Sequence, residues 1–343
     1  MSIDAKTVLN QLLAREDLTE QDAGSLMRLL ADETLPQAMS AALLIALRAK
    51  GETADEVRGF ATAMRDLART TTLPANVRIA ADVVGTGGDG SGSVNISTGT
   101  GLLVAAAGVP VVKHGNRSVS SKSGSSDVLE ALGVPLPDGP EAAMRCLETC
   151  GFTFLFAPYF HPAMKAIAPV RGAMGVRTVF NLLGPLTNPA RPSHNLIGAF
   201  DLPTARLMAD ALAEMDIERA FVVHGEPGWD EATPCGPFAL FDVRDGKVRE
   251  EQRDPADYGL APCQPADLAG GDAQHNAQAL EAVLKGEDRG AHRDALTLGA
   301  GLVMELTGRA NDLGEGIAQA NAALDDGSAV ALLERLRGFA AAS

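Results

Sequence analysis

The sequence predicts an α/β fold, a mostly parallel sheet covered by helices, preceded by a region that is helical only. Residues 1–73 carry apolar side chains at helical spacing and no strand-like run. From Arg78 onward, short runs rich in β-branched and aromatic residues alternate with helical stretches. This alternation is typical of parallel strands joined by crossover helices. Pro74 marks the change between the two regions.

The N-terminal helices have recognisable ends. Thr19 with Asp22, and Thr53 with Glu56, have the spacing of capping boxes, in which the first residue begins a helix. Gly51 follows a helical run and suits its C-terminal end. Leucines recur at the spacing of a core-facing stripe: Leu12, Leu13, Leu26, Leu29 and Leu30.

The α/β region contains five apolar runs that we predict to be its strands: Arg78–Val84, Val109–Val112, Thr153–Phe156, Asn195–Phe200 and Ala220–His224. Helices are predicted over 98–107, 124–133, 140–150 and 203–215. Pro237–Val243 and Lys247–Gln252 flank Asp245-Gly246, which is typical of a hairpin. The segment 161–190, broken by prolines, predicts short helices and loops, and the final 70 residues are helical again.

Composition limits the function classes. The formal charge is 29 − 44 = −15, which argues against a broad basic face for nucleic acid or anionic membranes. No apolar run reaches the ~18 residues of a membrane span. The N-terminus lacks the pattern of a signal peptide. We therefore expect a soluble, cytoplasmic protein with no nucleic-acid or membrane partner. Its four cysteines form no CxxC pair, and we expect reduced thiols.

The first predicted strand runs directly into the glycine-rich stretch GTGGDGSGSVNIST, residues 85–98. Ligands of α/β sheets bind beyond the C-terminal ends of strands. Gly85, Gly87 and Gly88 permit close backbone approach, and their amides can point at phosphate oxygens. A plain tight turn is the alternative. No GK[ST] follows, so the stretch is not a Walker A loop.

Asp89 adds information about the ligand, because a carboxylate inside a phosphate cradle repels bare phosphate. The ligand is therefore better understood as a sugar phosphate whose hydroxyls bond that carboxylate. Ser93, Asn95, Ser97 and Thr98 add neutral donors and acceptors, or serve only to cap the following helix.

The second strand runs into KHGNRSVSSKSG, residues 113–124, a basic and serine-rich stretch in an acidic chain. Lys113 and Arg117 can supply charge-assisted bonds to phosphoryl oxygens. His114 is either a satisfied loop histidine or a direct ligand contact. Two neighbouring anion-binding loops suit a ligand with two phosphate-bearing ends.

Two further candidates lie later in the chain. Asp230 and Glu231 follow a strand end, and two carboxylates are what Mg²⁺ takes from protein when phosphates and water complete its octahedron. Arg171 lies in an apolar stretch broken by proline and glycine. It either grips a substrate carboxylate bidentately or forms a structural ion pair.

Six motifs in order resemble the anthranilate phosphoribosyltransferases, which catalyse the second step of tryptophan synthesis from chorismate. They are GTGGD (85–89), NIST (95–98), KHGNRSVSSKSGSSD (113–127), APYFHPAM (157–164), VRTVFNLLGPLTNP (176–189) and DE (230–231). The resemblance covers nearly the whole chain. It implies a small all-helical domain of residues 1–73 plus about 163–190, and an α/β domain of 74–162 plus 191–343. It places the active site in the cleft between them and implies a homodimer that contacts through the helical domain.

The resemblance also implies the chemistry. The phosphoribosyl group of 5-phosphoribosyl 1-diphosphate (PRPP) passes to the amine of anthranilate, with Mg²⁺ as cofactor, two ions per monomer, and no covalent nucleophile. The matching PRPP-binding positions are Gly85, Gly88, Asp89, Ser93, Asn95, Ile96, Ser97, Thr98, Lys113, His114, Gly115, Asn116, Arg117, Ser118, Val119, Ser120, Ser121 and Ser125. The anthranilate positions are Gly85, Asn116 and Arg171, and the metal positions are Ser97, Asp230 and Glu231.

Two rival interpretations remain at this point. Pyrimidine nucleoside phosphorylases resemble this plan, but they are longer and carry a KHS-type loop. A non-enzymatic relative that binds nucleic acid needs a basic groove and degraded motifs. Small departures from the family pattern, Gly99-Thr100-Gly101 and Ala232, remove no polar group that the chemistry requires.

Overall fold

The region before the first strand is helical, as the sequence predicts. Its described helices are α1 (Ala5–Leu13), α2 (Glu20–Leu30), α3 (Gln37–Lys50) and α4 (Ala54–Asp66). The computed structural model describes residues 3–117, 122–134 and 136–341. Thr53 and Glu56 form the reciprocal capping box at the start of α4. Thr19 accepts a hydrogen bond from the Asp22 amide at the start of α2. Gly51 ends α3 with a φ of +96°, a conformation that glycine adopts without strain.

The sheet has seven strands in the order β3-β2-β1-β4-β5-β6-β7. Their bounds are β1 Ala81–Gly85, β2 Val111–Gly115, β3 Phe152–Phe156, β4 His194–Gly198, β5 Arg219–Gly225, β6 Phe238–Arg244 and β7 Lys247–Arg253. The first five strands are parallel, and β6 and β7 form the predicted hairpin, in which β6 is antiparallel to β5 and β7 is antiparallel to β6. The carboxyl ends of the parallel strands therefore share one edge, where the glycine-rich and basic stretches meet.

The strand boundaries differ from prediction in one place that matters for the site. β2 continues to Gly115, so Lys113 and His114 belong to the strand and not to the loop after it. They are in register with Phe154 and Leu155 of β3, and the buried neighbour strand holds both in extended conformation. The prediction ended the strand at Val112 because charged residues rarely lie inside a buried sheet.

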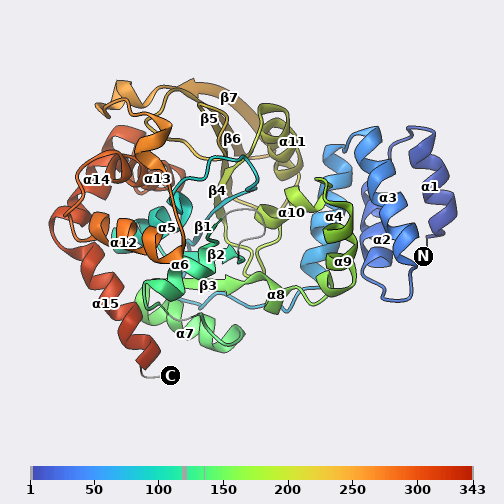
Figure 1. Cartoon of the computed structure of the whole chain (residues 1–343), viewed down its shortest axis with the longest axis horizontal. Helices are drawn as coiled ribbons and strands as arrows, with labels where there is room; N and C mark the ends of the chain where they lie inside the picture. Colours follow the sequence, from blue (N-terminus) through green and yellow to red (C-terminus); the bar gives the residue numbers. More distant parts are fainter. Residues whose placement is uncertain (1–2, 118–121, 135, 342–343) are drawn as a thin grey trace.

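Helices cover both faces of the sheet (Figure 1). α5 (Ile96–Ala106) and α13 (Ala291–Leu306) contribute to one core, and α11 (Leu202–Ala213) contributes to the other. The remaining helices are α6 Ser125–Ala131, α7 Pro140–Cys150, α8 Ala157–Phe160, α9 Met164–Met174, α10 Phe180–Leu186, η1 Pro255–Tyr258, η2 Pro265–Leu268, α12 Ala273–Leu284, α14 Leu313–Asp325 and α15 Ser328–Ala341.

α9 and α10 lie beside the N-terminal helices in space (Figure 1). Ile167 and Val170 of α9 share the hydrophobic core of α1–α4. Phe180 of α10 meets Phe60 of α4 edge to face, with ring centroids 6.2 Å apart. We call α1–α4, α9 and α10 the helical unit. The predicted short helices of 161–190 are confirmed, although Pro169 and Pro185 lie inside them and not between them.

The cysteines are free thiols, as expected. The Sγ atoms of Cys235 and Cys263 are 3.6 Å apart. Among the described helices, none combines the length and apolar character needed to cross a bilayer.

Candidate active site

Three loops at the carboxyl edge of the sheet enclose one cavity of about 590 Å³. The first follows β1, the second follows β2, and the third follows β5 and carries Asp230 and Glu231. Residues 270–276 close the remaining side. The structure thus brings together the three sequence motifs that were proposed to bind phosphate and metal.

The glycines of the first loop leave room for the Asp230 loop of the protein itself, as well as for a ligand, to approach the backbone closely. Gly87 and Gly88 have φ values of +67° and +75°, which favour glycine. The Gly87 amide donates to Asp230 Oδ2 at 2.6 Å. A Cβ on Gly85 would lie 2.3 Å from that same oxygen, and one on Gly198 would lie 1.5 Å from the Asp230 carbonyl oxygen. The acidic loop can therefore pack here only against glycines.

Asp89, Asp230 and Glu231 form an acidic cluster. The Asp230 amide donates to Asp89 Oδ2 at 3.2 Å, and the Ser97 amide donates to Glu231 Oε1 at 3.2 Å. Burial and the Asp89 charge raise the pKa of Asp230 to about 7. Burial and the Asp230 charge raise the pKa of Glu231 to about 8. These raised pKa values mean that the neighbouring protein groups supply too little positive charge to stabilise both carboxylates in the ionised form.

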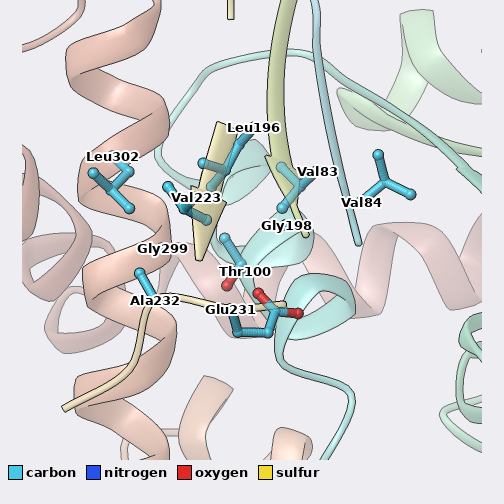
Figure 2. A pocket seen from close by; sticks show the side chains of 10 residues that line it. All are labelled: Val83, Val84, Thr100, Leu196, Gly198, Val223, Glu231, Ala232, Gly299 and Leu302. Carbon is cyan, nitrogen blue, oxygen red and sulfur yellow. The ribbon is translucent and has the colours of Figure 1, made fainter. Parts of the chain in front are cut away.

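The inner side of Glu231 faces protein. Figure 2 shows its side chain beside Thr100 of α5, close to the end of β4 at Gly198. A cavity of about 10 Å³ lies behind it, lined largely by apolar side chains such as Leu302 and Val223. This small cavity therefore offers the carboxylate little compensating charge.

Lys113 lies near the acidic cluster, on the side of the sheet, and is 1% exposed. Its Nζ donates to the Val83 carbonyl and, at 3.2 Å, to Ser97 Oγ. Burial lowers the pKa of Lys113, while Asp82, Glu231 and Asp230 oppose that shift. The ammonium group therefore lies between the sheet and the cluster, with its hydrogen bonds shared with protein oxygens. Its predicted contact with PRPP stays a prediction.

The basic loop is oriented by α6. Arg117 donates to Asp127 at 2.7 Å and to Glu130 at 2.9 Å, and its amide donates to Asn116 Oδ1 at 2.7 Å. Gly115, Asn116, Arg117 and Ser125 line the cavity, together with Lys122, which the sequence reasoning did not assign. The predicted contacts Ser118, Val119, Ser120 and Ser121 lie outside the described residues.

Asn276 is a cavity residue that the sequence reasoning missed. It is buried on α12, and its Nδ2 donates to Asn95 Oδ1 at 2.8 Å. Asn95 Nδ2 in turn donates to the Ser123 carbonyl at 3.2 Å, so the two amides connect the first and second loops. The Gly271 amide donates to Asn276 Oδ1 at 2.7 Å. The available signal was Gly270-Gly271 directly before a helix.

His114 lines the cavity but is buried, and its Nδ1 lies 3.1 Å from the Gly184 carbonyl of α10. Its ring centroid is 5.0 Å from that of buried His161. Burial lowers the pKa of His114 to about 3 and that of His161 to about 4, so both rings are neutral at pH 7. Its Nδ1 contacts protein, whereas its Nε2 is buried with no hydrogen-bond partner among the described residues, so a direct ligand contact of His114 stays a prediction.

Two predicted site residues do not line the cavity. Thr98 is 0% exposed, and its hydroxyl has no hydrogen-bond partner among the described residues. Arg171 is half-buried on α9, with its guanidinium 5.4 Å from the Phe180 ring centroid. Within the described ranges no carboxylate lies within ion-pair distance of Arg171, and burial lowers its pKa. A structural ion pair, the alternative role considered for Arg171, is therefore absent there. The other described candidates all line the cavity: Gly85, Gly88, Asp89, Ser93, Asn95, Ile96, Ser97, Lys113, His114, Gly115, Asn116, Arg117, Ser125, Asp230 and Glu231.

Comparisons with known proteins agree on one family. Residues 78–330 match the model of the glycosyl transferase family, a/b domain, and residues 6–68 match that of its helical bundle domain. An anthranilate phosphoribosyltransferase of Rubrobacter xylanophilus is 44% identical over 96% of both chains. The crystal structure of the Thermus thermophilus enzyme is 43% identical, with a TM-score of 0.91 over 97% of this chain and 98% of that one. The Saccharomyces cerevisiae enzyme in complex with PRPP and Mg is 25% identical, with a TM-score of 0.89 over 99% and 98%.

Proposed function

The chain belongs to the anthranilate phosphoribosyltransferase family, and from that premise we propose which residues of its cavity carry out the reaction. The enzyme transfers the phosphoribosyl group of PRPP to the amine of anthranilate, giving N-(5-phosphoribosyl)anthranilate and diphosphate in tryptophan synthesis. The observation that carries the assignment of residues is the convergence of the glycine-rich loop, the basic loop and the acidic pair on one cavity.

PRPP binds between the first two loops in this proposal. Backbone amides around Gly88 and the N-terminus of α5 receive phosphoryl oxygens, as helix N-termini do. Asn116, Arg117 and Ser125 contribute polar groups from the second loop. Asp89 braces the first loop, because its Oδ1 accepts from the Ser91 amide at 3.0 Å and its Oδ2 accepts from the Asp230 amide.

Asp230, Glu231 and Ser97 fit Mg²⁺ by their chemistry, since all three offer hard oxygen donors. Among the described residues no three His, Cys, Asp or Glu side chains form a ready-made cage. Mg²⁺ characteristically takes one or two carboxylates from protein and the rest from substrate phosphates and water. Bound there, it stabilises the negative charge of the departing diphosphate. We propose two ions per chain, because the acidic pair and the diphosphate together carry more charge than one ion neutralises.

Anthranilate is oriented by its carboxylate and its position beside Gly85. Arg171 and Asn116 are the proposed partners, and the absence of an ion-pair partner for Arg171 among the described residues supports this role. The aryl amine is neutral at pH 7 and attacks the ribose C1′ as diphosphate leaves. Positioning of the two substrates and stabilisation of the leaving group carry the catalysis, with no covalent intermediate.

We propose that residues 1–73 and about 163–190, which contain the helical unit, form a separate domain. Residues 74–162 and 191–343 form the other domain, and the active site lies at the boundary between the two. Its outer surface exposes Leu13 and Ile45, at 65% and 41% of their full area. Apolar side chains on a helical surface favour association, so we propose a homodimer through this unit. Light scattering after size exclusion measures the mass directly. We further propose that the enzyme works in the cytoplasm.

The test is consumption of anthranilate in the presence of PRPP and Mg²⁺, followed by the loss of anthranilate fluorescence. We expect turnover that requires all three components and releases one diphosphate per anthranilate. Thymidine or uridine with inorganic phosphate should give no product, which separates this activity from that of a nucleoside phosphorylase. Binding of labelled nucleic acid without anthranilate turnover would contradict the proposal.

A further inference from the structure

Arg177 connects the helical unit to the glycine-rich loop. It lies between α9 and α10, and its Nη2 donates to the Gly88 carbonyl, 89 residues away in sequence. Its guanidinium lies over the Phe200 ring, 3.9 Å from the ring centroid. In the described part of the chain no carboxylate lies within ion-pair distance of this exposed arginine. Its contacts are therefore with one carbonyl and one aromatic face.

The bond to Gly88 fixes the orientation of a peptide plane. Gly88 and Asp89 line the cavity, whereas Arg177 does not. In a trans peptide the carbonyl of one residue and the amide of the next point in opposite directions. Holding the Gly88 carbonyl toward Arg177 therefore directs the Asp89 amide away from Arg177. Gly88 has a φ of +75°, in which glycine has many alternative conformations, so an external contact is needed to select one.

Phe200 ties Arg177 to the start of the same loop. The Phe200 amide donates to Thr86 Oγ1 at 3.2 Å, and the Thr86 amide donates to the Gly198 carbonyl at 2.9 Å. The aromatic ring thus has a fixed place relative to Gly88. An arginine can stack its flat guanidinium on an aromatic face and at the same time donate a hydrogen bond in the guanidinium plane. A lysine ammonium is not planar and cannot do both.

We propose that Arg177 is a positioning residue that holds the Gly88–Asp89 peptide in the orientation that receives PRPP. This inference rests on the proposed function, in which the glycine-rich loop binds the phosphoribosyl donor. Arg171, the proposed anthranilate contact, lies six residues earlier in the same unit.

The experiment compares Arg177→Met, Arg177→Lys and Phe200→Leu with Arg206→Met, which removes the same charge from an exposed pair with Asp210. PRPP affinity is measured by calorimetry with Mg²⁺ and without anthranilate, and kinetics are measured for each substrate. Arg177→Met should weaken PRPP binding about ten- to a hundredfold, as expected for one charge-assisted bond. kcat at saturating PRPP should change less than threefold. Arg177→Lys should recover part of the PRPP affinity, and Arg206→Met should match the wild type.

The double variant Arg177→Met with Phe200→Leu separates indirect from direct action. If the two residues act as one unit, Phe200→Leu weakens PRPP binding in the wild type and adds nothing to Arg177→Met. Fully additive losses would mean that Arg177 contacts PRPP itself, which overturns the positioning role.

Two other results also overturn the proposal. One is an unchanged PRPP affinity in Arg177→Met. The other is a large fall in melting temperature with equal losses for both substrates, which indicates a structural role only. Absence of PRPP-dependent turnover in the wild type would instead overturn the proposed function, so the two failures are distinguishable.

Discussion

The amide of Gly87 donates a 2.6 Å hydrogen bond to the carboxylate of Asp230, so the glycine-rich loop and the acidic pair are one structural unit. Removing the charges of Asp230 and Glu231 should affect the Mg²⁺ dependence of turnover more than the stability of the fold. We expect Asp230→Asn with Glu231→Gln to lower kcat by at least about tenfold and to raise the Mg²⁺ requirement, because the ion loses its protein carboxylates. Turnover measured across a Mg²⁺ series checks this. Asp245→Asn with Glu250→Gln, two exposed hairpin residues, is the matched control. Wild-type turnover at every Mg²⁺ concentration would remove the pair from the metal site.

Gly198→Ala should disrupt the same unit from the sheet side. Its Cβ would lie 1.5 Å from the Asp230 carbonyl oxygen, so the acidic loop must move. Overpacking of this kind typically costs ~1–3 kcal/mol of unfolding free energy, and activity should fall with it. Urea unfolding and turnover check both effects. Gly338→Ala on α15, where an added Cβ meets nothing within 4 Å, should be neutral or slightly stabilising. Equal stability and activity of Gly198→Ala and wild type would contradict the packing argument.

Asp89→Ala should weaken PRPP binding although it removes a negative charge from an anion site. Asp89 holds the loop through the Ser91 and Asp230 amides, and an alanine leaves both donors without their acceptor. Calorimetric titration with PRPP measures the effect. Tighter binding would show that phosphate repulsion outweighs the bracing of the loop.

Arg171→Ala should raise the KM for anthranilate with a smaller change for PRPP. A lost charge-assisted bond typically costs ~1.5–3 kcal/mol, or about ten- to a hundredfold in affinity. Steady-state kinetics for both substrates and a melting curve are the measurements. Because no ion pair is broken within the described residues, the melting temperature should hold. Equal losses for both substrates with a large fall in melting temperature would assign Arg171 to structure instead.

His114 and His161 should make the fold sensitive to mild acid. Their pKa values, about 3 and about 4, lie below that of an unfolded histidine, so the unfolded chain binds protons that the folded chain excludes. Stability contributed by the neutral rings is present above pH ~6.5 and is lost as the pH falls toward ~4, by about 1.4 kcal/mol per pH unit for each ring. Burial raises the pKa values of Asp82, Asp230 and Glu231 to about 6, 7 and 8, which acts in the opposite direction, so a difference measurement is needed.

Urea unfolding of wild type and His161→Gln between pH 7 and pH 4.5 supplies that difference. The wild type should lose stability relative to the variant as the pH falls, whereas exposed His275→Gln should follow the wild type. A constant difference across the range would show that His161 binds protons equally in the folded and unfolded states, which would contradict the burial argument.

Much of this architecture could be predicted from the sequence because its signals are local. Capping residues, the alternation of strands and helices, and the glycine-rich stretch need no knowledge of distant contacts. The missed features depend on contacts between remote segments. Lys113 is a strand residue because β3 holds it in register, and Asn276 enters the site only because its amide meets Asn95. Arg117 pairs with α6, which its neighbours in sequence do not reveal.

The helical unit is discontinuous, and this affects how the chain folds during its synthesis. Phe60 packs against Phe180, which is synthesised much later, and the core of α1–α4 also contains the later residues Ile167 and Val170. Roughly 120 residues separate the end of α4 from the end of α10, which takes about 6–24 s to translate at 5–20 residues per second. During that interval the four nascent helices expose the apolar faces that α9 and α10 later cover. We therefore expect synonymous codons that slow translation between α4 and α10 to increase aggregation, measured as the insoluble fraction, without altering the finished enzyme.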